Sequence, residues 1–147
     1  MRWKGCLFYS GRVRTLLVDG HYYTYRSFFA IRELSNSKGE PTNAIYGFVK
    51  VLRKMLRDLA PDRAAVFWDM GLPARRTELQ PEYKQNRAEM PDLMRPQIGH
   101  IQRLVPLMGL KSIAVPDTEA DDLMAVYTKA AEAGGDEVIL ATNDKDL

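Results

Sequence analysis

The chain has 147 residues, 46% of them hydrophobic and 27% charged, which suits one globular domain with a buried core. Its single cysteine excludes an intrachain disulfide, and no apolar run approaches the roughly 20 residues of a membrane span, so we expect a cytoplasmic protein. The net charge of +2 hides an asymmetry, because residues 1–116 carry a net +9 and residues 117–147 a net −7.

Short apolar runs alternate with amphipathic segments along the chain. The runs at 14–18, 64–68, 112–115 and 137–141 predict buried strands. Helices are expected at 21–34, at 42–59, around 101–108 with Pro96 and Pro106 limiting it, and from the acidic stretch at 117–122 to Gly134. This alternation predicts an α/β fold in which helices cover both faces of a parallel sheet.

The segment 70–90 has no clean apolar period and is long for a connection, so we expect a functional loop. Its basic side chains could hold phosphates and its tyrosine could stack on a base. These residues are Arg75, Arg76, Tyr83, Lys84 and Arg87. The alternative is a solvated loop, because three glutamates offset much of the positive charge.

Acidic residues follow every predicted strand. They are Asp19, Asp69, the group Asp117, Glu119, Asp121 and Asp122, and finally Asp144 and Asp146. Parallel strands bring their carboxyl ends to one edge of the sheet, which is where open α/β folds place their sites. Like charges so close would hold protons unless a hard cation such as Mg²⁺ or Mn²⁺ joined them. Two such ions about 3.5–4 Å apart suit phosphodiester hydrolysis.

Helix capping is the simpler explanation of the acidic stretch 117–122. Thr118 could cap the following helix, with Asp121 as its partner three residues later. Capping accounts for one or two acids but not for four. For the two histidines, His21 and His100, we expect positions on the protein surface.

Six motifs resemble the 5′-nuclease domain at the N-terminus of bacterial DNA polymerase I, a relative of the flap endonucleases with a Rossmann-like, PIN-like fold. The motifs run in order from about Leu16 to Leu147: LLVDGHYYTYRSFFAI, GEPTNAIYGFVKVL, VFWD, RRTELQPEYKQNRAEMP, VPDTEADDLMA and TNDKDL.

The resemblance implies a 5′-3′ exonuclease or flap endonuclease that cuts DNA at 5′ ends with divalent metal, Mg²⁺ or Mn²⁺, using two ions in the complete domain. The implied metal and catalytic acids are Asp19, Asp69, Glu119, Asp121, Asp122, Asp144 and Asp146. Lys84 matches a residue near the scissile phosphate, and Arg26, Arg76 and Arg87 match basic DNA contacts. The stretch from about 72 to 90 would belong to an arch over the 5′ end, and Asp117 matches no ligand.

Two departures from the family shape our expectations. Residues 1–13 look like an atypical tail, and the domain at 14–147 stops before a Gly-Asp-rich segment and a helix–hairpin–helix element. We therefore expect a truncated domain that lacks its C-terminal half and a polymerase domain. We also expect the second ion site, near Asp144 and Asp146, to lack ligands. The alternatives are an inactive DNA-binding remnant, a receiver domain that binds Mg²⁺, and a ribonuclease of the small PIN-domain type.

Overall fold

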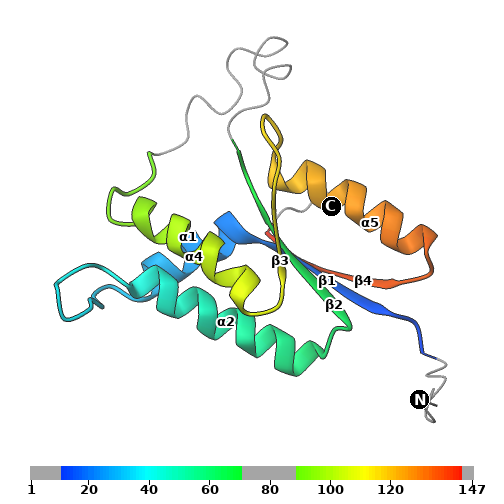
Figure 1. Cartoon of the computed structure of the whole chain (residues 1–147), viewed down its shortest axis with the longest axis horizontal. Helices are drawn as coiled ribbons and strands as arrows, with labels where there is room; N and C mark the ends of the chain where they lie inside the picture. Colours follow the sequence, from blue (N-terminus) through cyan, green and yellow to red (C-terminus); the bar gives the residue numbers. More distant parts are fainter. Residues whose placement is uncertain (1–10, 71–88, 144–147) are drawn as a thin grey trace, which may run out of the picture.

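The computed structural model describes residues 11–70 and 89–143, which form an α/β fold around a parallel sheet (Figure 1). Four strands pair in the order β3-β2-β1-β4. Their bounds are Arg14–Asp19 for β1, Arg63–Trp68 for β2, Lys111–Ala114 for β3 and Glu137–Ala141 for β4. Every pairing is parallel, as the alternation of elements predicts.

Helices cover both faces of this sheet. On one face lie α1 (Gly20–Ala30), α2 (Asn43–Leu59) and α4 (Arg95–Leu107), and on the other lies α5 (Ala120–Ala133) (Figure 1). The helix α1 packs mainly on α2, whereas α5 contacts β1, β2 and β4.

The central strand β1 supplies side chains to both layers of the core. Leu16 and Val18 face the larger layer, where they pack with residues such as Phe48, and Leu17 faces the smaller layer with Met124. Successive side chains of a strand point to opposite faces, so a strand buried on both sides needs an unbroken apolar run. This explains why residues 15–18 are all buried.

The observed helices differ most from the prediction at the C-terminal end of α1 and at the start of α4, which begins at Arg95 and not near Ile101. The predicted helix to Leu34 ends at Ala30, because Ile31 takes an extended conformation and residues 32–34 are exposed and have no apolar face to bury. Both prolines of α4 lie in terminal turns: Pro96 is in the first turn, where helical amides need no partner, and Pro106 is in the last.

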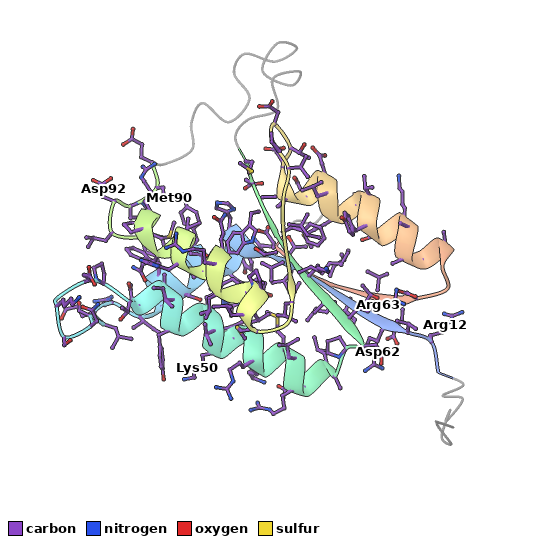
Figure 2. All side chains as sticks on the ribbon, in the orientation of Figure 1. Arg12, Lys50, Asp62, Arg63, Met90 and Asp92 are labelled. Atoms are coloured by element: carbon purple, nitrogen blue, oxygen red, sulfur yellow. The ribbon has the colours of Figure 1, made fainter. Side chains whose placement is uncertain are left out.

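Paired charges join the strands at the amino end of the sheet, where Figure 2 labels Arg12, Asp62 and Arg63. The Arg14 Nε atom lies 3.2 Å from Glu137 Oε2, across the β1–β4 pair. Thr15 donates its hydroxyl hydrogen to Asp136 Oδ2 at 2.7 Å. Among the described residues, no helix is long and apolar enough to cross a membrane.

Candidate metal centre

Asp19 ends β1 at the carboxyl edge of the sheet and caps α1. Its Oδ1 accepts a hydrogen bond from the Tyr22 amide at 3.0 Å, and its Oδ2 accepts one from the Thr142 hydroxyl at 3.4 Å. Burial raises the pKa of Asp19, the hydrogen bond from the Tyr22 amide lowers it, and the charges of Asp69 and Asp121 raise it. Asp19 therefore lies within electrostatic reach of acids from two other segments.

Asp69 follows β2 and joins that strand to α5. Its Oδ1 accepts a hydrogen bond from the Ala120 amide at 2.7 Å. Ala120 is the first residue of α5, and its amide has no acceptor within the helix. Asp69 thus supplies a cap to a helix 51 residues further along the chain.

Glu119, Asp121 and Asp122 form a compact carboxylate group at the start of α5. Each offers one oxygen, and the three oxygens lie within 4.8 Å of one another. Glu119 is only 1% exposed, although an ionised carboxylate is costly to bury without a compensating charge. This proximity and burial suit a hard cation, whose preferred ligands are carboxylate oxygens and water.

The capping box that Thr118 and Asp121 could form is absent. The Thr118 hydroxyl donates instead to the Pro116 carbonyl at 3.1 Å, and the N-cap position of α5 falls on Glu119, whose side chain makes no capping bond. The predicted Thr118 cap was therefore wrong, although Asp121 and Asp122 do lie in the first turn of the helix. The first amide of the helix, that of Ala120, is met by Asp69 from another strand.

Asp117 lies outside the carboxylate group, in agreement with its assignment as a loop residue. It is exposed and has a left-handed backbone with φ of 55°. Its amide donates to the Met70 carbonyl at 3.1 Å, and the Met70 amide donates to the Thr118 carbonyl at 3.3 Å. These two bonds hold the chain after β2 against the loop that leads into α5.

His21 is mostly buried, which contradicts the expectation of a surface position. Its side chain is 17% exposed, its Nδ1 accepts a hydrogen bond from the Asp69 amide at 3.1 Å, and its ring lies edge-on to Trp68. Because Nδ1 accepts from the amide, its 3.8 Å approach to Asp69 Oδ2 is not an ion pair in this arrangement. The only sequence signal was its place directly after the Asp19-Gly20 strand end. His100 is exposed, as expected.

The structure thus gathers acids from the ends of three strands. They are Asp19 at the end of β1, Asp69 after β2, and Glu119, Asp121 and Asp122 after β3. Arg26 lies exposed on α1, the helix that Asp19 caps. The remaining predicted site residues lie outside the described part of the chain, namely Arg75, Arg76, Tyr83, Lys84, Arg87, Asp144 and Asp146.

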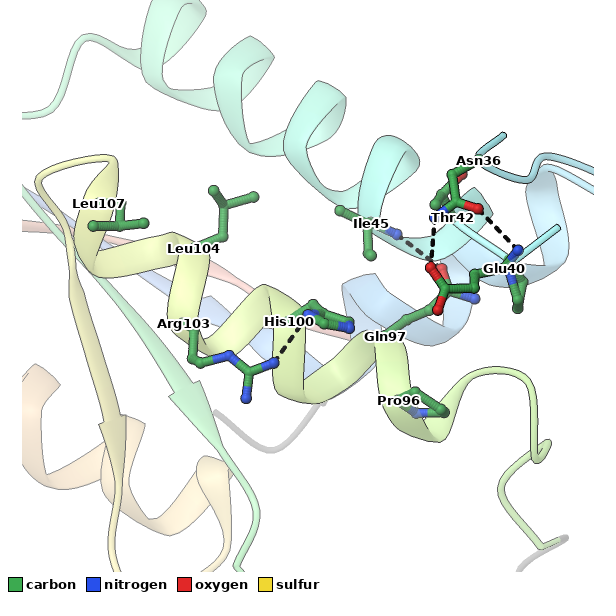
Figure 3. Close-up of a pocket in the computed structure, with 11 residues that line it drawn as sticks. Asn36, Glu40, Thr42, Ile45, Pro96, Gln97, His100, Arg103, Leu104 and Leu107 are labelled. Carbon is green, nitrogen blue, oxygen red and sulfur yellow. Dashed lines mark hydrogen bonds between the residues drawn. The ribbon is translucent and has the colours of Figure 1, made fainter. Parts of the chain in front are cut away.

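A groove of about 550 Å³ lies elsewhere, between the α1–α2 loop, α2 and α4 (Figure 3). Ile45, Leu104 and Leu107 belong to its lining, and Arg103 donates to His100 Nδ1 at 2.9 Å on one wall. It shares no lining residue with the five clustered acids, so the carboxylate edge and this groove are separate features.

Comparisons with known proteins agree on one family. The family model described as "5′-3′ exonuclease, N-terminal resolvase-like domain" matches residues 14–147. A thermostable DNA polymerase I of Thermus thermophilus is 45% identical over 134 residues, which cover 91% of this chain and 16% of that protein. A 5′-3′ exonuclease of Aquifex aeolicus is 37% identical over 131 residues, which cover 89% of this chain and 45% of its own length.

Solved structures from bacteriophage T5 share the fold. The T5 protein co-crystallised with metal ions has a TM-score of 0.72 and 22% identity, and the match covers 90% of this chain and 50% of that one. A T5 flap endonuclease in a pseudo-enzyme-product complex with DNA and metal ions has a TM-score of 0.61 and 21% identity, with 90% and 49% covered. The predicted PIN-like parallel sheet is therefore confirmed, and the chain spans at most about half of each of these proteins.

Proposed function

Because the chain belongs to the family of 5′-3′ exonuclease N-terminal resolvase-like domains, we propose that it hydrolyses DNA phosphodiesters at 5′ ends and flaps with divalent metal. One observation carries the proposal: acids after three parallel strands converge at the carboxyl edge of the sheet, where such folds place their sites. Both relatives are longer than this chain, which spans 16% of the polymerase and 45% of the exonuclease.

The clustered acids fit a hard divalent cation such as Mg²⁺ or Mn²⁺. Each acid of the cluster offers a carboxylate oxygen in a partly or fully buried position. The acids that would hold the ion are Asp19, Asp69, Glu119, Asp121 and Asp122. When bound, such ions activate a water molecule and stabilise the leaving oxygen of a phosphodiester. A second ion would rest on Asp144 and Asp146, and a C-terminal half of the kind expected from the resemblance would complete its ligands.

The acids of the chain would hold the metal ion in place and would not act as nucleophiles. Asp19 is fixed by its bond to the first turn of α1, and Asp69 fixes the first turn of α5. The carboxylates therefore sit on the rigid ends of strands and helices, which limits the reorganisation needed when charge develops in the transition state. The Glu119 side chain is itself buried away from water.

Basic side chains would hold the DNA backbone beside the acids. Arg26 is exposed on α1, one turn beyond the residue whose amide Asp19 caps. Guanidinium groups bind phosphate oxygens through paired hydrogen bonds. We propose the same role for Arg76 and Arg87, a contact of Lys84 with the scissile phosphate, and stacking of Tyr83 on a base.

Single-turnover cleavage of a 5′-labelled flap DNA by the purified chain tests the proposal. Product should form with Mg²⁺ or Mn²⁺, disappear with EDTA, and disappear in Asp121→Asn. The matched control is Glu132→Gln, because Glu132 is an exposed acid on the same helix outside the carboxylate group. A folded wild-type chain that cuts no DNA with any metal would contradict the proposal and favour the alternative of an inactive DNA-binding remnant.

A further inference from the structure

The imidazole of His21 connects two strand ends of the carboxylate edge. His21 is the second residue of α1, directly after Asp19 and Gly20 of the β1 end. Its Nδ1 accepts the hydrogen bond of the Asp69 amide at 3.1 Å, 48 residues away. The described sheet pairing of β2 ends at Trp68, so this amide lies just beyond the last strand pair.

Packing leaves the imidazole little freedom to move. Its ring centroid lies 5.5 Å from that of Trp68, at an interplanar angle of 76°, and Trp68 is 1% exposed. At Gly20, an added Cβ would lie 2.6 Å from ring atoms of Trp68, so the helix backbone is seated directly on this indole. The histidine is thereby held between the start of α1 and the end of β2.

We propose that His21 is a positioning residue that sets the spacing between Asp19 and Asp69 through its hydrogen bond to the Asp69 amide. The inference rests on the proposed metal-dependent function and extends it to a residue outside the carboxylate set. Asp69 in turn accepts from Ala120, at the start of the helix that carries Asp121 and Asp122. His21 therefore links the end of β1 to Asp69 through the Asp69 amide. The Asp69 carboxylate continues this link to the start of α5.

The acceptor atom, rather than the ring, is the feature to test. Asparagine places its Oδ1 where histidine places Nδ1, leucine has the shape of asparagine without an acceptor, and phenylalanine keeps a ring without an acceptor. Groups that orient metal ligands from outside the coordination sphere alter metal affinity by about 10-fold to 100-fold when removed. We expect His21→Leu and His21→Phe to weaken Mn²⁺ binding about tenfold and His21→Asn to stay close to wild type.

Two measurements on the full chain decide the proposal. Mn²⁺ affinity is measured by electron paramagnetic resonance, and protection of the Asp69 amide is measured by hydrogen exchange without metal. Protection should persist in His21→Asn and fall in His21→Leu, while thermal unfolding reports that both variants fold. The control is His100→Leu, which removes the exposed histidine of α4.

Mn²⁺ affinity equal to that of the wild type in both His21→Leu and His21→Asn would overturn the proposal. Equal weakening in both would also overturn it, because the ring and not the acceptor would then matter. A wild-type chain that binds no Mn²⁺ would instead contradict the proposed function, and Asp69 exchange would still decide whether His21 holds that amide. Should His21→Phe not fold, the leucine and asparagine variants suffice.

Discussion

The Asp69 carboxylate caps α5 by accepting the Ala120 amide at 2.7 Å, so an acid at the end of one strand also starts the helix that carries Asp121 and Asp122. A shift of the end of β2 would therefore move the carboxylate group with it.

Removing this cap should destabilise the chain. Loss of a capping acceptor costs about 0.5–2 kcal/mol, so Asp69→Ala should lower the free energy of unfolding by about 1 kcal/mol. Asp69→Asn keeps an oxygen for the Ala120 amide and should cost less. Urea unfolding in EDTA measures both variants, and equal stability of the alanine and asparagine variants would contradict the capping role.

The stability of the metal-free chain should depend on pH because of Asp19. Its pKa is raised in the folded state, mainly by burial, so its stabilising contribution is complete below the usual carboxyl pKa and is lost as pH rises through the folded value. Asp19→Asn keeps the acceptor for Tyr22 and removes the charge. We expect this variant to gain stability over wild type near pH 7 but not near pH 4, the usual carboxyl range.

Urea unfolding in EDTA at the two pH values checks this expectation. Glu132→Gln serves as the control, because it removes one exposed carboxylate from α5. If Asp19→Asn were less stable than wild type near pH 7, the buried charge would not be the destabilising group.

Metal should stabilise the chain, and EDTA should reverse the effect. A ligand that binds only the folded state at about 100 times its Kd adds about 2.7 kcal/mol to the free energy of unfolding. Mn²⁺ should therefore raise the Tm of the wild type and of Glu132→Gln. Asp121→Asn should show little rise, and a full rise in this variant would place the ion elsewhere.

Two glycine substitutions test how closely α1 packs on β2. A Cβ at Gly20 would meet ring carbons of the buried Trp68 at 2.6 Å, so Gly20→Ala should destabilise by about 1–3 kcal/mol. Gly99 lies within α4 with no atom within 4 Å of an added Cβ, so Gly99→Ala should stabilise by about 0.5–1 kcal/mol. Thermal unfolding of the two variants should shift Tm in opposite directions.

Sequence periodicity was sufficient to predict the strands and their direction. Residues 15–18 are buried because both faces of β1 are covered. The acids at the ends of β1 and β2 lie at the same edge of the sheet because these strands are parallel. The failures concern contacts between distant segments. Neither the Ala120 amide on Asp69 nor the Asp69 amide on His21 leaves a local pattern, because the partners are 51 and 48 residues apart.

The two ends of the sheet respond oppositely to ionic strength. At the amino end, Arg14 faces Glu137 and Arg63 lies 3.7 Å from Asp136, so dissolved salt weakens attractions there. At the carboxyl end the acids repel one another, so the same salt relieves repulsion. Added salt would therefore weaken the amino end of β1 relative to its carboxyl end in the metal-free chain.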